Sequence, residues 1–250
     1  EYVRLFGGWT TDAKDVPTAV RGYFENGGQF AYVTRIVHYS DVTDATTKTS
    51  DPATVTLVDR ANVPLDTLEV TAKSDGTWGN ALRVEIAAPT NGATAEFNLL
   101  VKHSSGLVLE TWANLSMVDG HERYVESIIN AEVGGSQYIV VEDLDSATAS
   151  PNDRPAVGTS SLSGGDDGLT SLADTDFLEA GGTGLHRMNE TLDITLMSIP
   201  GRTSSTVVNG LLTYIIGRDD LFAIAILDPP ANTTASGMLT YVNSTASLYN

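Results

Sequence analysis

The sequence has 250 residues, of which 32 are acidic and 14 basic, so its formal net charge at pH 7 is −18, and it contains no cysteine. Nucleic-acid binding needs a cluster of basic side chains, and an anionic membrane surface repels a chain of this charge, so the composition excludes both partners. The lack of cysteine excludes disulfides and thiolate metal sites, and no apolar run approaches the roughly 20 residues of a membrane span.

The excess of acidic side chains favours solubility and repulsion between molecules. Two other interpretations stay open: acidic faces that meet basic faces of neighbouring subunits, and adaptation to high salt. Because the sequence starts at Glu1 without methionine and opens in the middle of a pattern, we expect it to be a fragment of a longer protein.

The first elements are predicted to be a helix, a strand and a loop. The helix is expected to begin near Pro17, whose missing N–H is unused in a first turn, and to end at Gly27-Gly28. Phe30–Val37 is rich in β-branched and aromatic residues, which predicts a strand. Asp41–Pro52 is rich in Thr, Asp and Ser without periodicity, which predicts a loop. The apolar face of the helix is Val16, Val20, Tyr23 and Phe24.

The middle of the chain alternates between apolar and polar residues, which is typical of antiparallel strands with one wet face. A further strand is expected over Leu107–Trp112, a short amphipathic helix over Tyr124–Ile129, and another strand over Tyr138–Val141. Asp143–Gly168 is a long segment rich in Ser, Asp, Gly and Pro, and we expect it to be the connection that returns to the first domain. The alternating apolar positions are Leu68, Val70, Ala72, Leu82, Val84, Ile86, Phe97, Leu99 and Val101.

The last part of the chain contains a strand–helix–strand unit. Asp193–Ile199 is a short apolar run that predicts a buried strand, and Pro200-Gly201 ends it. The hydroxyls around Ser204 can cap a helix that Gly217 ends. Leu221–Leu227 predicts a second strand, and because both strands are apolar on both faces, we expect helices on each side of the sheet. The apolar stripe of the helix is Val207, Val208, Leu211, Leu212, Ile215 and Ile216.

Five segments of the sequence form a recognisable series. They are Phe6-Gly7-Gly8, Ala19–Gly28 leading into Ala31–Ile36, Gly76–Asn80, Leu162–Gly168, and the strand–helix–strand unit from Ile194 to Pro230. In this order, over nearly the whole chain, they resemble the contractile tail sheath proteins of myophage tails and related contractile injection systems. Within this resemblance Trp78-Gly79-Asn80 is expected to be structural: the indole fills a gap and the glycine lets the chain turn into the next strand.

The patterns predict an α/β plus β fold with two domains. We expect residues 1–50 and 160–250 to form a discontinuous α/β core domain, with helices covering a mixed sheet. Residues 51–159 are expected to form an inserted β-rich domain with its linker. The resemblance to sheath proteins implies the same arrangement, in which an outer domain is inserted into a core-facing one.

The sequence offers no catalytic, cofactor-binding or metal-binding residues, and we expect no enzyme. The histidines, His38, His103, His121 and His186, fall on different predicted elements, and the nucleophile-elbow and phosphate-loop motifs are absent. Asp166-Asp167-Gly168 lacks the alternating ligands of a calcium loop, so a turn that caps the next helix is favoured over a cation site. For the Asp143–Asp153 loop, too, a solvated loop is favoured over a cation site.

The resemblance implies a structural subunit of a contractile phage tail sheath, which polymerises around the tail tube and contracts to drive tube penetration and genome delivery. Its partners would be other sheath copies, the tail tube protein, and baseplate and tail terminator proteins, in the virion tail and, during assembly, in the host cytoplasm. In the family, Ala246–Tyr249 would lead into a further domain that faces the tube, so we expect this fragment to be monomeric or weakly associating.

Two other functions stay open. The richness in Thr, Ser and Asp and the β-rich middle are also typical of a secreted acidic surface module or a carbohydrate-binding module. A covered parallel sheet is compatible with an α/β hydrolase or transferase, although a fold does not supply a function. A deep pocket with converging polar groups would favour the enzyme.

Overall fold

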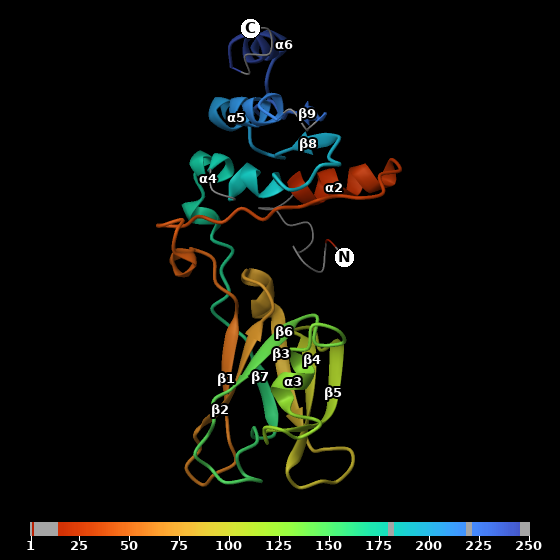
Figure 1. Ribbon diagram of the computed structural model, residues 1–250, viewed down its shortest axis with the longest axis vertical. Coiled ribbons are helices and arrows are strands. Elements are labelled where there is room, and N and C mark those ends of the chain that lie inside the picture. The colour runs from red at the N-terminus through yellow and green to blue at the C-terminus, as the bar shows by residue number, and fades with distance from the viewer. Residues whose placement is uncertain (1, 3–14, 180–182, 219–221, 246–250) are drawn as a thin grey trace. The chain divides into compact units, whose positions relative to one another are not determined.

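The computed structural model describes residues 2, 15–179, 183–218 and 222–245, and the chain divides into two compact units (Figure 1). Unit 1 comprises Glu1–Ala45 and Thr170–Asn250, and unit 2 is the continuous segment Thr46–Leu169. Helices and strands are both present, which confirms the mixed α and β character expected from the sequence. Three features used in the sequence analysis lie outside the described residues: Phe6-Gly7-Gly8, Leu221 and Ala246–Tyr249.

Unit 2 contains two antiparallel sheets that share one core. The alternating apolar positions predicted from the sequence are buried, with Leu68, Val70, Phe97 and Leu99 at 0% exposure, and they join side chains of both sheets in a single cluster. Burying a side chain of this size stabilises the fold by about 1.5–3 kcal/mol. One sheet has the order β1 (Thr54–Val58), β2 (Asp66–Ala72), β6 (Ile139–Asp143). The other has the order β5 (Val108–Ser116), β4 (Glu96–His103), β3 (Leu82–Ala87), β7 (Gly158–Ser161).

The end of unit 2 differs from the sequence-based boundary. The predicted connection Asp143–Gly168 contains β7, which pairs with β3, so this segment belongs to unit 2 up to Leu169 instead of ending at residue 159. The strand was missed because Gly158–Ser161 reads Gly-Thr-Ser-Ser and has no apolar alternation. At the other end unit 2 begins at Thr46 instead of residue 51. The predicted short helix is present as α3 (Val125–Ile129).

Unit 1 opens with the predicted helix, α2 (Asp15–Glu25). Gly27, at φ 91°, and Gly28 end the helix by donating their N–H groups to Phe24 O (3.1 Å) and Tyr23 O (3.0 Å). This pair of hydrogen bonds is the Schellman motif, which needs a left-handed residue and therefore favours glycine. The strand predicted over Phe30–Val37 is not found: the segment forms no ladder with any strand that the structure describes.

The strand–helix–strand unit is present as β8 (Leu196–Ser198), α5 (Ser205–Ile216) and β9 (Ile224–Ile226), with the two strands parallel. Ser204 caps α5, because its hydroxyl accepts the N–H of Val207 at 3.3 Å. Gly217 follows the helix as predicted. The apolar stripe differs at its end: Ile216 is 80% exposed, and Tyr214 is buried in its place.

The sheet of unit 1 is smaller and more open than predicted. Instead of a mixed sheet covered on both faces, the described residues contain only the parallel pair β8–β9. Met197 of β8 packs on the α5 side, with Leu211 and Tyr214, whereas Leu196, Ile224 and Ile226 on the opposite face are 45%, 68% and 50% exposed. The other described helices of unit 1 are α4 (Asp174–Leu178), η4 (Gly184–Met188), α6 (Ala235–Thr240) and η5 (Tyr241–Thr245). Short helices η1 (Ala45–Thr47) and η3 (Leu169–Ser171) lie where the two units meet in the sequence, and η2 (Thr77–Ala81) precedes β3. Among the described helices none is both long and apolar enough to cross a bilayer.

Candidate functional site

The two chain segments that enter and leave unit 2 lie side by side as a short antiparallel pair. Asp51 and Asp166 exchange both backbone hydrogen bonds, at 3.0 and 2.9 Å. Three residues further into the unit, Thr54 and Ser163 do the same, at 2.8 and 3.0 Å. The first and last segments of unit 2 therefore pair with each other, and this pairing closes the unit.

A third segment, the loop before β3, bonds to the leaving segment. Asn80 donates its side-chain N–H to Gly165 O and accepts Gly165 N–H, both at 2.9 Å. The carboxylate of Asp167 accepts the hydroxyl of Thr77 at 2.6 Å and its backbone N–H at 3.1 Å. We call residues 48–54, 75–80 and 162–168 the junction clamp.

Glycines allow the backbones of the junction clamp to approach closely. A Cβ on Gly165 would lie 2.4 Å from the carbonyl oxygen of Gly76, which is closer than any real Cβ contact. A Cβ on Gly79 would lie 2.8 Å from the Cβ atoms of both Ala53 and Ala72. Trp78 packs against the core of unit 2 and donates its indole N–H to the carbonyl of Asp75 at 3.1 Å, so the expected structural role of Trp78-Gly79 is confirmed.

The entering segment is also bonded through Asp75. Its carboxylate accepts both hydrogen bonds from Lys48 Nζ, at 2.7 Å, and one from Ser50 Oγ at 2.5 Å. The side chain of Asp75 is 17% exposed and that of Lys48 33% exposed, so this ion pair is less screened than a surface pair. The junction clamp therefore joins three segments through backbone pairs, an amide and two carboxylates.

The acidic turn Asp166-Asp167-Gly168 serves this closure. Asp166 Oδ1 accepts the N–H of Gly168 at 2.7 Å, and Gly168 has a φ of 67°. Of the described residues, no group of three or more His, Asp or Glu side chains is arranged to hold a metal ion, at this turn or in the Asp143–Asp153 loop.

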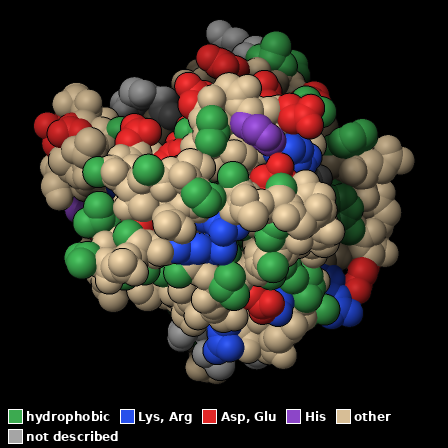
Figure 2. Space-filling model, turned by 90° about the horizontal axis from the view of Figure 1, so that it is seen from below, with side chains coloured by type: hydrophobic (Ala, Val, Ile, Leu, Met, Phe, Trp, Pro, Cys, Tyr) green, Lys and Arg blue, Asp and Glu red, His purple; other side chains and the backbone are tan. Residues whose placement is uncertain are grey.

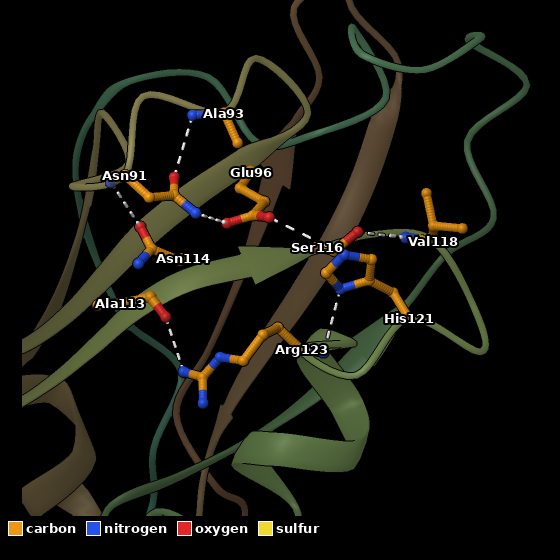
Figure 3. Close-up of polar contacts among 9 residues, drawn as sticks. All are labelled: Asn91, Ala93, Glu96, Ala113, Asn114, Ser116, Val118, His121 and Arg123. Atoms are coloured by element: carbon orange, nitrogen blue, oxygen red, sulfur yellow. Dashed lines mark hydrogen bonds and ion pairs between the residues drawn. The ribbon is translucent and has the colours of Figure 1, made fainter.

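A second polar network fixes the loops at one end of β4 and β5 (Figure 3). The carboxylate of Glu96 accepts Asn91 Nδ2 at 2.8 Å and lies 3.9 Å from His121 Nε2. Asn114, at φ 55°, accepts the backbone N–H of Asn91, and Arg123 donates to a carbonyl of β5 at 2.7 Å. Because these groups bond to one another and to nearby backbone, we interpret the network as one that holds the loops in place.

Unit 1 contains a hollow of about 550 Å³ beside α5. Tyr214 lies in its wall, donates its hydroxyl hydrogen to Asn189 Oδ1 at 3.0 Å and accepts from Arg218 at 2.9 Å. His186 contacts the same ring edge-on, at 5.4 Å between centroids. The described residues that line the hollow include His186, Thr213 and Arg218 but no carboxylate, serine or cysteine.

The other three histidines do not line this hollow, and each has a partner elsewhere. His38 lies 3.0 Å from the carboxylate of Asp176 in unit 1, whereas His103 pairs with Ser105 at 2.9 Å and His121 with Glu96 in unit 2. Each histidine therefore contacts residues of its own unit. Gly76–Asn80 and Leu162–Gly168 were singled out from the sequence, but their contact was not, because no local pattern indicates a contact across 85 residues.

Comparison with known proteins gives similarity only to solved structures. No protein-family model and no curated protein matches the sequence. The sheath tail protein Lin1278 from Listeria innocua is similar over 69% of this chain and 32% of its own length, with 15% identity and a TM-score of 0.40. The sheath tail protein DSY3957 from Desulfitobacterium hafniense is similar over 78% of this chain and 44% of its own, with 14% identity and the same TM-score.

This chain therefore spans less than half the length of either sheath tail protein. A TM-score of 0.40 is too low to establish a shared fold. The function proposed below rests on the residues and contacts of this chain.

Proposed function

We propose that this chain is part of a structural subunit of a contractile phage tail sheath. The subunit polymerises around the tail tube, and contraction of the polymer drives tube penetration and genome delivery. Work of this kind comes from the free-energy difference between two packings of the same subunits, so it needs stable subunits and bistable contacts between them. No catalytic activity is expected.

The junction clamp is the observation that carries the proposal. Gly76–Asn80 and Leu162–Gly168 are two of the segments on which the resemblance to sheath proteins depends. They are far apart in the sequence: Asn80 and Gly165 are separated by 85 residues. In the structure they bond to each other and close unit 2 on itself. Because the two segments need each other to close unit 2, their joint presence in the sequence supports the resemblance to sheath proteins.

The closed unit 2 also suits a subunit that transmits force. The segments by which the chain enters and leaves unit 2 are paired with each other, so a load carried along either segment reaches the same bonded pair. In the proposed arrangement unit 1 belongs to the core-facing domain and unit 2 is the outer insertion. Partners are other sheath copies, the tail tube protein, and baseplate and terminator proteins, with assembly in the host cytoplasm and a final place in the virion tail.

The carbohydrate-binding alternative finds no support in unit 2. Saccharide platforms use exposed aromatic rings, but the exposed large apolar side chains that the structure describes in unit 2 are all aliphatic. They are Val58, Val63, Leu65, Leu107, Val108, Val118, Val133, Val157 and Leu169.

Electron microscopy of the full-length parent protein tests the proposal. Expressed without other tail proteins, the parent is expected to form striated tubes or short helical stacks, because a heterologous contact that does not close produces an open polymer. A parent that stays a compact monomer or closed dimer at all concentrations contradicts the proposal.

A further inference from the structure

The β1–β2 turn at one end of unit 2 is held rigid by a buried carboxylate. Asp59 is 1% exposed and accepts hydrogen bonds from Ser146 Oγ at 2.6 Å and from the backbone N–H groups of Ala61 and Leu65 at 3.0 and 3.1 Å. These bonds, with one from the side chain of Thr148, hold the pKa of Asp59 far below its usual range. The turn is thus fixed before any partner arrives, which reduces the entropy cost of binding.

Two arginines lie together at this end without a carboxylate. Arg60 donates its backbone N–H to Asn152 O at 2.9 Å and its Nε to Pro155 O at 2.8 Å. Arg154 donates to the carbonyls of Pro151 and Glu96 at 2.8 and 2.9 Å. Among the described residues neither guanidinium has an acidic group within 4.0 Å, although the chain holds 32 acidic side chains.

The surroundings of the two arginines make this lack of a carboxylate costly. Burial and the neighbouring guanidinium of Arg154 lower the pKa of Arg60, and Arg60 Nη2 is buried without a hydrogen-bond partner. Desolvated charge without a counter-charge destabilises a fold, and a carboxylate brought by a partner would relieve that cost.

Exposed aliphatic side chains lie on the same two loops as the arginines. Val63 is 78% exposed and Val157 62%, and Leu65 is 43% exposed on the same turn as Arg60. Figure 2, which views the molecule from below, shows Lys and Arg side chains near the centre of this face with hydrophobic side chains around them. Arginine beside exposed apolar groups on a rigid turn is typical of the energetically important part of a protein interface. We call residues 58–65 and 151–157 the tip.

Unit 1 carries a surface of complementary chemistry. The open face of the β8–β9 sheet presents Leu196, Ile224 and Ile226, which are half to two-thirds exposed. Asp193 precedes β8 and Asp228 follows β9, so an acidic residue lies beyond each end of the strand pair; Asp193 accepts a hydrogen bond from the hydroxyl of Tyr32 at 3.1 Å and Asp228 from the N–H of Gly201 at 2.8 Å. A parallel two-stranded sheet with one uncovered face is not a stable arrangement on its own, which favours its being covered in the assembled protein.

We propose that the tip of one copy docks on the open β8–β9 face of a second copy. Val63 and Leu65 cover the apolar face, and Arg60 and Arg154 meet the carboxylates at its ends. The occupant is a second copy because the same chain supplies both complementary surfaces. The contact is heterologous, so it propagates from copy to copy unless its rotation closes a ring. This inference deepens the proposed function, because it names one contact between sheath copies. Only the biological role of the contact rests on the proposed function; the contact itself does not.

Sedimentation of the 250-residue chain over a concentration series tests the contact. The measurement belongs at about 0.15 M salt, where repulsion between copies of charge −18 is screened beyond roughly 8 Å. We expect weak association, in which the weight-average mass rises with concentration. A mass that stays at 26.5 kDa throughout overturns the proposal. So does a tip that docks within its own molecule, which gives a more compact particle without a rise in mass.

Matched substitutions locate the contact. Val63→Asp on the tip and Ile224→Asp on the sheet face are each expected to weaken association about tenfold or more, the effect of removing one central contact. Val133→Asp, at a side chain 90% exposed elsewhere in unit 2, and Ile216→Asp, at one 80% exposed on α5, are the controls and should leave association unchanged. Arg154→Glu should weaken association like Val63→Asp. Equal effects of test and control substitutions overturn the proposal.

The failure of this contact and the failure of the proposed function are separable. If the full-length parent carrying Val63→Asp still forms striated tubes, the tip contact is wrong and the sheath role stands. If the wild-type parent forms no tubes while the 250-residue chain associates through Val63 and Ile224, the sheath role is wrong and the contact stands.

Discussion

The substitution Asn80→Ala tests the closure of unit 2. Asn80 makes two hydrogen bonds to the backbone of Gly165, and Gly165 is buried, so its N–H and C=O groups lose their partners when the amide is removed. A typical hydrogen bond contributes about 0.5–1.5 kcal/mol, and a buried group left unpaired costs about 1–3 kcal/mol. Because Asn80 lies at the surface and water can replace part of its role, we expect a loss of about 2 kcal/mol in the free energy of unfolding.

Asn130 offers a chemically matched control. Its side chain also makes two hydrogen bonds to one residue, donating to Val141 O at 2.7 Å and accepting Val141 N–H at 2.9 Å, away from the junction clamp. Asn130→Ala should therefore cost a similar free energy of unfolding, measured by urea denaturation. Only Asn80→Ala should speed hydrogen exchange selectively at Ser163 and Gly165, because it opens the clamp locally.

Two results would refute this reasoning. One is unchanged exchange at Ser163 and Gly165 in the Asn80→Ala protein, which would mean that the backbone pairs close unit 2 without the amide. The other is equal acceleration of exchange in both variants, which would mean that the clamp opens only with global unfolding.

Three further substitutions test other parts of the account. Asp59→Asn should lower the urea midpoint at pH 7, because hydrogen bonds hold the pKa of Asp59 below its ordinary 3.8; this difference from wild type should shrink as the pH falls below about 4. Asp143→Asn should have the opposite sign, since burial raises the pKa of Asp143 and its charged form costs stability above about pH 4; a lower midpoint at pH 7 would contradict this. Gly79→Ala should lower the free energy of unfolding by about 1–3 kcal/mol in the same titration, because its Cβ would lie 2.8 Å from those of Ala53 and Ala72; wild-type stability would show that the site is loosely packed.

Periodicity predicted the parts of the fold that depend on it. Leu82, Val84 and Ile86 alternate with polar residues in the sequence and are all buried in β3. The strand–helix–strand unit was predicted because a cap, an apolar stripe and two short apolar runs agree with one another across Ser204–Ile226. These signals are local, so a single sequence contains them.

The remainder depended on tertiary contacts. β7 is held by its register with β3 and not by its own residues, so its polar sequence resembled a loop. Phe30–Val37 has the composition of a strand but no partner in the described structure, and composition cannot supply one. The junction clamp brings Asn80 to Gly165 across 85 residues, and no local pattern indicates that distance. The open face of β8–β9 was missed because apolar strands predict a covered sheet whether the cover belongs to the same chain or to another copy.

Immunogold labelling of the source particles tests the central claim most directly. An antibody against unit 2 should label the tails of assembled virions along their whole length, before and after contraction, at a regular spacing. Label confined to the cell envelope or the culture medium, with bare tails, would contradict the sheath role and favour a surface module.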